Sequence, residues 1–302
     1  MLITKDILVE HQALIDRDNE FQREARLRQA LWRERRGLPI GLHRGKELGS
    51  RLAMPFAQET LANYLTENIK SVVRAEVQKT EKLYRAPRIY DDLLSSQPLC
   101  FNLFGELHLD LDLATAVFRH LLGENLRVTG IEFEHSPGRG ERRFTHDGSA
   151  LDVFVKYEFN GGAGFVGVEV KYVEDLDRDE ARYRKRYDEV TRQMGIFEPT
   201  ALSQLRERPL EQFWRDHLLV GGMLLDQESG FERGMFAVLY PKGNTVIESA
   251  VTRYRSCLLD AATFTSWTLE QVLDAVDQAG AAGWVTEVRE RYLPVQTPTT
   301  TG

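Results

Sequence analysis

The spacing of apolar residues changes partway along the chain, and this change predicts the order of its elements. In the first 85 or so residues the apolar positions recur every three or four residues, as on one face of a helix. Phe21–Arg36, which ends before Gly37 and Pro39, and Pro55–Lys82 are the clearest cases. We therefore expect a helical N-terminal region, and a further helical stretch over Pro98–Leu122.

Three consecutive stretches then show the character of strands. Leu126–His135 alternates with a period of two, and Leu151–Phe159 and Phe165–Val173 are rich in β-branched and aromatic residues. Asn160-Gly161-Gly162 lies between the last two and favours a tight hairpin. These stretches predict an antiparallel meander.

Two helices and a fourth strand complete the expected core. The helices are a charged one over Asp179–Met194 and one opened by Pro209, and the strand is Met235–Tyr240. A strand reached through a helical crossover can lie parallel to the strand before it. The predicted fold class is therefore α/β, with a mixed sheet of four or five strands flanked by helices and an N-terminal helical region.

We divide the chain into three regions on this pattern. Residues 1–85 form the helical N-terminal region, residues 86–245 form the core, and residues 246–302 form a C-terminal helical segment with a flexible tail. In the last region Thr268-Leu269-Glu270-Gln271 has the capping-box pattern that begins a helix.

Composition narrows the class of protein without indicating an activity. The chain is 42% hydrophobic and 28% charged, which is ordinary for a soluble globular protein. No apolar run approaches the roughly 18 residues that span a bilayer, and the charged N-terminus does not resemble a signal peptide, so we expect no membrane association. Cys100 and Cys257 are the only cysteines, which favours a cytoplasmic location. The phosphate-loop, dinucleotide, serine-hydrolase and Cys-x-x-Cys motifs are absent from the sequence.

The charge is unevenly distributed along the chain. The net charge is −7, yet the segment Gln22–Arg51 holds nine Lys or Arg and three Glu. This segment has two interpretations: an arm that follows phosphates, or a solvated helix with its own acidic partners. If this segment lay beside the carboxylates of Asp152 and Glu169, a polymeric substrate would be favoured. Arg182–Arg186, with Arg215 and His217, are further candidates for phosphate contacts.

The chemistry is concentrated in Glu169-Val170-Lys171 on the third expected strand. Glu169 and Lys171 are two residues apart and so share a face, while the valines between and before them face a core. Asp152, near the start of the second strand, shares that face only if the hairpin loop has an even number of residues. With Gly161-Gly162 as the loop, Asp152 would lie opposite Lys171.

Carboxylates brought together in this way favour a metal site. Two of them about 4 Å apart repel by about 4 kcal/mol at an effective dielectric constant of 20. A divalent cation removes that cost, and oxygen ligands suit Mg²⁺ or Mn²⁺. Lys171 would then orient a water molecule or neutralise charge on a phosphate. The alternative is an ordinary ion pair on a solvated face of the sheet.

Asp152 and Glu169-Val170-Lys171, on this order of elements, resemble the PD-(D/E)XK nuclease motif. The segments Leu94–Gly105 and Gly167–Tyr172 resemble a prokaryotic group of restriction-endonuclease-like proteins, and the resemblance covers about residues 85 to 245. It implies that Asp152, Glu169 and the Val170 carbonyl bind the metal ion and that Lys171 assists catalysis. Leu151 stands where the motif has proline, a position that supplies no ligand.

The resemblance also implies an additional acidic ligand and a function. Glu106 and Glu134 are the two candidates for that ligand. We expect a Mg²⁺-dependent (or Mn²⁺-dependent) endonuclease that acts on DNA, with defence against foreign DNA as its role and a homodimer as one expected assembly. Two alternatives stay open: a catalytically silent nucleic-acid-binding or scaffold protein with this fold, and a hydrolase of smaller phosphodiesters.

Overall fold

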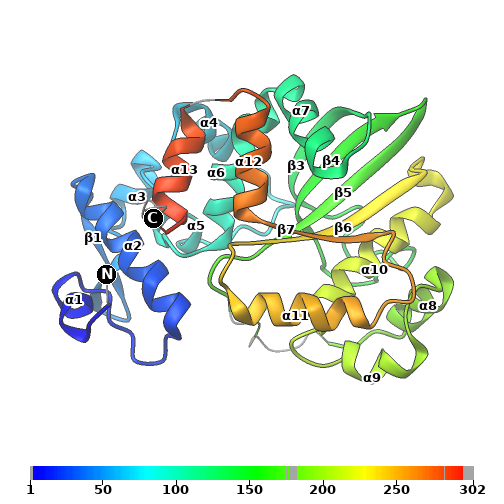
Figure 1. The fold of residues 1–302 in the computed structure, drawn as a ribbon, viewed down its shortest axis with the longest axis horizontal. Helices are drawn as coiled ribbons and strands as arrows, with labels where there is room; N and C mark the ends of the chain where they lie inside the picture. Colours follow the sequence, from blue (N-terminus) through cyan, green and yellow to red (C-terminus); the bar gives the residue numbers. More distant parts are fainter. Residues whose placement is uncertain (1–2, 175, 177–181, 282, 295–302) are drawn as a thin grey trace, which may run out of the picture.

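A five-stranded mixed sheet with helices on both faces forms the centre of the protein (Figure 1). The computed structural model describes residues 3–174, 176, 182–281 and 283–294. The strands follow the order β3-β4-β5-β6-β7 across the sheet. Their bounds are Arg127–His135 (β3), Leu151–Phe159 (β4), Gly162–Val170 (β5), Arg233–Tyr240 (β6) and Phe264–Thr268 (β7).

The directions of the strands confirm the predicted α/β fold. β3, β4 and β5 form an antiparallel meander, and β6 pairs parallel to β5 after a helical crossover. β7 pairs parallel to β6 and is the fifth strand. It was not predicted as a strand, and it extends the sheet beyond residue 245, within the part assigned to a C-terminal helical segment.

Helices cover both faces of the sheet and enclose two apolar cores. On one face the valines of β4 and β5 pack against helices from before β3 and from the C-terminal part of the chain. On the other face aromatic residues such as Phe154, Phe165 and Phe236 pack against the helices between β5 and β7. The helices are α4 (Glu67–Glu76), α6 (Ser96–Leu109), α7 (Leu111–Leu122), α12 (Leu269–Gln278) and α13 (Trp284–Tyr292) on the first face, and α8 (Lys185–Met194), α9 (Leu202–Leu205), α10 (Glu211–Leu225) and α11 (Thr245–Ser256) on the second.

The N-terminal region is less helical than predicted. It contains α1 (Lys5–Glu10), α2 (Glu20–Arg35), α3 (Phe56–Thr60) and α4, but also a hairpin of β1 (Ile40–His43) and β2 (Lys46–Leu52), and the short helix α5 (Arg88–Asp91) follows it. The single helix predicted over Pro55–Lys82 is wrong: Leu61 adopts a left-handed conformation (φ 52°), and Thr66 caps the separate helix α4. A capping side chain that satisfies a free N–H lets a new helix begin there.

The β4–β5 turn differs from the expected one by one position. Phe159 pairs with Gly162, so the two-residue loop is Asn160-Gly161, with φ of 45° and 86°. Positive φ at both central residues is the geometry of a type I′ turn, which Asn-Gly favours. The loop has an even number of residues, as the site requires, but Asp152 lies opposite Glu169 rather than Lys171.

A buried arginine joins the two ends of the chain. Arg291 of α13 is fully buried and donates hydrogen bonds to Gln29 of α2 (3.0 Å) and to the carbonyl oxygen of Asn63 (2.6 Å). Its guanidinium also lies 4.1 Å from the ring centroid of Trp32. The C-terminal helix is therefore part of the N-terminal packing, as Figure 1 shows.

Candidate active site

Three neighbouring strands each contribute one carboxylate to the same cavity. Glu134 lies near the end of β3 in a left-handed backbone conformation (φ 47°), and its side chain lines the same cavity as Asp152 and Glu169. The register of β4 and β5, which pairs Val153 with Val168, places Asp152 opposite Glu169. Opposed residues of antiparallel strands share a face. Asp152 and Glu169 therefore share a face, and Glu134, which was also a predicted ligand, lines the same cavity.

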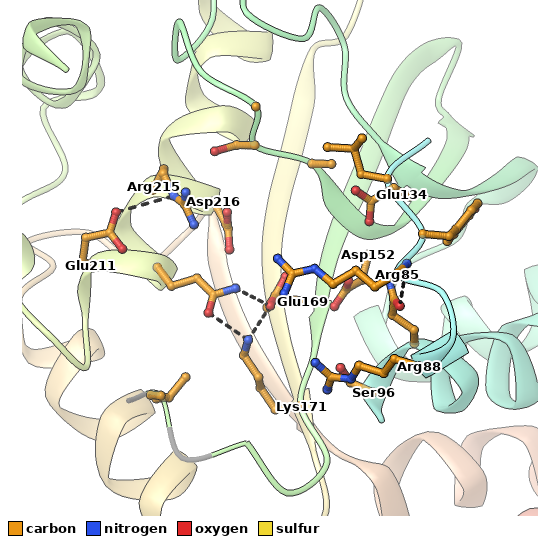
Figure 2. Close-up of a pocket in the computed structure, with 18 of the residues that line it drawn as sticks. Arg85, Arg88, Ser96, Glu134, Asp152, Glu169, Lys171, Glu211, Arg215 and Asp216 are labelled. Atoms are coloured by element: carbon orange, nitrogen blue, oxygen red, sulfur yellow. Dashed lines mark hydrogen bonds and ion pairs between the residues drawn. The ribbon is translucent and has the colours of Figure 1, made fainter. Parts of the chain in front are cut away.

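Lys171 completes this group from the residue after β5. Its Nζ donates hydrogen bonds to Glu169 Oε1 (2.5 Å) and to Gln212 Oε1 of α10 (2.9 Å). Gln212 in turn donates through Nε2 to Glu169 Oε1 at 2.6 Å. The three side chains form a closed cycle of hydrogen bonds, which Figure 2 shows at the centre of the pocket.

These side chains lie at the bottom of a cavity of about 550 Å³. Glu169 is 5% exposed and Lys171 is 3% exposed, so the alternative of an ion pair on a solvated face is wrong. In Figure 2, Glu134 and Asp152 lie on one side of Glu169, and residues of α10 lie on the other. The cavity is thus formed between the sheet and α10.

The cavity brings several carboxyl groups close together in a largely buried position. Burial and the negative charge of Glu169 raise the pKa of Asp152 well above its usual range, against the opposing effect of Lys171. Burial also raises the pKa of Glu134, and Glu169 adds to that increase. Two carboxyls whose pKa values rise because of a shared neighbour form a site that a cation would stabilise.

Lys171 keeps its charge in spite of its burial. Burial lowers the pKa of Lys171, but the carboxylates of Glu169, Glu174 and Asp152 outweigh that effect and raise the pKa above its ordinary value. The side chain is therefore an ammonium group at neutral pH and can act as a charged donor rather than as a base.

The Val170 backbone also faces Asp152. The Val170 N–H donates to Asp152 Oδ2 at 2.8 Å, while the next N–H, that of Lys171, donates to Leu239 of β6 at 2.8 Å. In a strand the N–H and C=O of one residue point toward the same neighbouring strand. The Val170 carbonyl therefore points to the side on which Asp152 lies.

Helix α10 supplies functional candidates that the sequence reasoning missed. Asp216 is 2% exposed, and its Oδ2 has no hydrogen-bond partner among the described residues. Burial and the charge of Glu169 raise the pKa of Asp216 well above its usual range. Asp216 and Gln212 are four residues apart, and both line the cavity because that spacing places them on one face of the helix.

Arginines surround the acidic centre of the cavity. Arg88 pairs with Glu174 (3.2 Å), and Arg139 pairs with Glu134 (3.5 Å). Arg85 lines the cavity and points into it in Figure 2, and its side chain makes no hydrogen bond or ion pair within the described part of the chain. Arg215 also lines the cavity, as expected, whereas His217 is buried between Tyr254 and Thr263.

Two sequence candidates lie away from this site. Glu106 accepts hydrogen bonds from Thr66 and from Asn68 (3.0 Å) near the start of α4, and it is not among the described residues that line the cavity. The described lining residues include none from the basic segment Gln22–Arg51, which therefore gives no support to a polymeric substrate. In that segment Arg26 pairs with Asp18 at 2.6 Å.

The donor set fits a hard cation, although the ligands are not yet arranged around one point. Asp152, Glu134, Glu169 and the unpartnered oxygen of Asp216 offer oxygen atoms, which Mg²⁺ and Mn²⁺ prefer. Within the described residues, no three His, Cys, Asp or Glu side chains already form a metal-ligand group. Glu169 is turned to Lys171 and Gln212, so binding would require it to exchange those partners.

Comparison with known proteins gave one match. A family model described as the PD-(D/E)XK nuclease superfamily matches residues 16–294, which is most of the chain. Searches of curated proteins and of solved structures returned no match. Among the described residues, no helix is long and apolar enough to cross a membrane.

Proposed function

The chain belongs to the PD-(D/E)XK nuclease superfamily, and from this we propose that it is a metal-dependent endonuclease that hydrolyses phosphodiester bonds in DNA. The observation that carries the proposal is the group of Glu134, Asp152 and Glu169 with Lys171 beside it, at the bottom of an open cavity. This is the donor set that a cation-assisted attack on a phosphodiester requires.

We propose that Asp152, Glu169 and the Val170 carbonyl hold the cation, with Glu134 as a further carboxylate. When bound, Mg²⁺ or Mn²⁺ supplies Lewis-acid polarisation of the phosphodiester. Glu106 has no part in this proposal, because its carboxylate is engaged by Thr66 and Asn68.

Lys171 is proposed to act through its positive charge. Its raised pKa keeps the ammonium protonated, so it can orient the attacking water and neutralise charge that develops on the phosphate. Gln212 holds the Lys171 side chain in place through the 2.9 Å hydrogen bond and acts as a positioning residue.

The remaining parts of the proposal rest on less direct support. The superfamily supports DNA as substrate, and the prokaryotic resemblance of the sequence supports a role in defence against foreign DNA. Both cysteines are buried and unpaired, which supports a cytoplasmic location. A homodimer is proposed as the assembly, and a measurement of mass in solution tests it.

A test is nicking of supercoiled plasmid with Mg²⁺ and with EDTA. We expect cleavage by the wild type with Mg²⁺, none with EDTA, and a loss of at least about 100-fold in Asp152→Asn and Lys171→Met, because each removes charge at the reacting phosphate. Glu106→Gln is the matched control and should cleave at the wild-type rate, since Glu106 lies outside the cavity.

The same assay separates the alternatives. Cleavage that persists in EDTA, or in both active-site variants, would mean that another site or a contaminant is responsible. DNA binding without cleavage, unchanged by Glu169→Ala, would instead support a catalytically silent binding protein. The hydrogen-bond cycle of Glu169, Lys171 and Gln212 also favours this alternative, because Glu169, a proposed metal ligand, is already engaged in it.

A further inference from the structure

Two smaller cavities continue the catalytic cavity along the surface. The first shares Arg139 and Gly148 with the catalytic cavity. The second shares His146 and Arg184 with the first. Each cavity therefore shares part of its wall with the next, and the series begins at the cavity lined by Asp152 and Glu169.

The walls of the two outer cavities are strongly basic. They come from the loop between β3 and β4 and from the residues around the start of α8. We call these two cavities together the cationic groove, and its Arg and Lys residues are Arg139, Arg142, Arg182, Arg184, Lys185 and Arg186.

The acidic residues of the groove are already engaged. Glu189 pairs with Arg186 at 3.2 Å. Asp147 accepts hydrogen bonds from Ser149 and Thr145 at 2.8–2.9 Å and also from Tyr187. Even with both of them charged, the two cavities are lined by six Arg or Lys and by two carboxylates, so positive charge prevails in the groove.

Several cations of the groove, by contrast, have no partner. Within the described part of the chain, the side chains of Arg142, Arg182 and Lys185 make no hydrogen bond or ion pair, and all three are exposed. The Nε of Arg184 is buried and unbonded. Unpaired cations gathered on a protein with a net charge of −7 indicate a polyanionic ligand.

An aromatic side chain in the groove indicates which kind of polyanion would bind there. Tyr183 lines the groove and is 46% exposed, which is unusual for a ring of this size. Arg206 lies over the ring at 5.3 Å, and the hydroxyl bonds to Asp188, so the ring is held in position. Exposed rings beside cations stack unpaired bases, whereas the bases of an intact duplex are already stacked on each other.

We propose that the cationic groove binds an unpaired strand of nucleic acid that extends from the scissile phosphate, with Arg182, Arg184 and Lys185 on its phosphates and Tyr183 against a base. The inference rests on the proposed function, and it specifies the substrate as a nucleic acid with a single-stranded segment next to the cleaved bond.

Binding without cleavage tests the proposal independently of catalysis. Fluorescence anisotropy in EDTA would compare a labelled 20-nucleotide single strand with the blunt duplex of the same sequence, over a range of NaCl concentrations. We expect the single strand to bind at least tenfold more tightly. The double variant Arg182→Ala/Lys185→Ala should weaken that binding about tenfold at 0.1 M NaCl. It should also reduce the steepness of the plot of log K against log of the NaCl concentration by about 1.4, since each phosphate contact on a single strand contributes about 0.7.

Arg23→Ala/Arg35→Ala is the matched control. Both arginines are exposed on α2, and the change removes the same charge from the basic segment Gln22–Arg51. This control should bind as the wild type does. Tyr183→Ala should weaken single-strand binding at least fivefold, and Tyr183→Phe, which keeps the ring, should not.

Each result has a clear meaning. Equal or stronger binding of the duplex, or wild-type affinity in Arg182→Ala/Lys185→Ala, would overturn the proposal, and so would an equal loss in the Arg23→Ala/Arg35→Ala control. If the groove binds the single strand as expected but no DNA or RNA is cut with Mg²⁺, the proposed nuclease function fails while the binding site stands.

Discussion

The carboxylate of Asp152 lies in the wall of the cavity, where two effects act on it: its burial and the charge of Glu169. Both raise the pKa of Asp152, so the folded chain holds this proton at pH values where the unfolded chain has released it. The ordinary pKa of aspartate is about 3.9. Stability must therefore fall as pH rises from about 4 through the raised pKa, because the folded state binds more protons.

This linkage gives a prediction for Asp152→Asn. The variant keeps an oxygen that can accept the Val170 N–H but removes the charge. In EDTA at pH 8 we expect it to be more stable than the wild type, because it carries no charge that burial penalises, and the difference should shrink toward pH 5. Thermal unfolding at several pH values measures it. Parallel pH curves for the two proteins would contradict the prediction.

At the scale of single residues, the sequence pattern identified the charged residues Glu169 and Lys171 but not the residues of α10 that lie against them. Glu169 and Lys171 share a strand, so a local pattern was enough to find them. Gln212 and Asp216 lie some forty residues further on, and only folding brings α10 over β5. The available signal was two polar residues at helical spacing in the first half of a helix whose second half is apolar.

At the scale of elements, the turn between β4 and β5 fixes which residues oppose each other. Gly161 has a φ of 86°, a conformation that costs other residues about 1–2 kcal/mol. We expect Gly161→Val to lower the free energy of unfolding by that amount, as measured in urea. Ala163→Val adds similar bulk two residues later, within β5, and should cost less. Equal losses in the two variants would exclude backbone strain as the cause.

Elements with a strong local period were predicted well, and those that depend on distant partners were not. Leu151–Phe159 was found with its observed bounds because it is rich in β-branched and aromatic residues and a turn follows. The break at Leu61 follows from packing and from the cap at Thr66, and the pattern of apolar residues does not reveal it. β7 is short and polar, and it becomes a strand because β6 offers it an edge.

At the scale of the whole molecule, Arg291 connects the first and last helices. Replacing it with alanine leaves the Gln29 and Asn63 acceptors without their charged donor inside the protein. We expect Arg291→Ala to destabilise the protein by about 3 kcal/mol or more. Arg289→Ala, on the same helix, removes only surface ion pairs with Asp274 and Asp277 and should cost less than about 1 kcal/mol. Chemical denaturation that ranks the two variants equally would contradict this assignment.

The overall distribution of charge was a poor guide to where a ligand would bind. The basic segment Gln22–Arg51 attracted attention because its residues are adjacent in sequence. In the folded chain Arg26, Arg33 and Arg51 are largely used for internal ion pairs and hydrogen bonds. The cationic groove takes four of its six Arg or Lys residues from the other basic window, Arg182–Arg186, and only folding adds Arg139 and Arg142 to them.

Strand β5, which carries Glu169, is the middle strand of the five. An outer strand can fray while the rest of a protein stays folded, but a strand with hydrogen-bonded neighbours on both sides separates only when the sheet itself comes apart. Glu169 is therefore held in the part of the protein that opens last. Mild heating that loosens the outer strands would therefore leave Glu169 in place until the whole sheet unfolds.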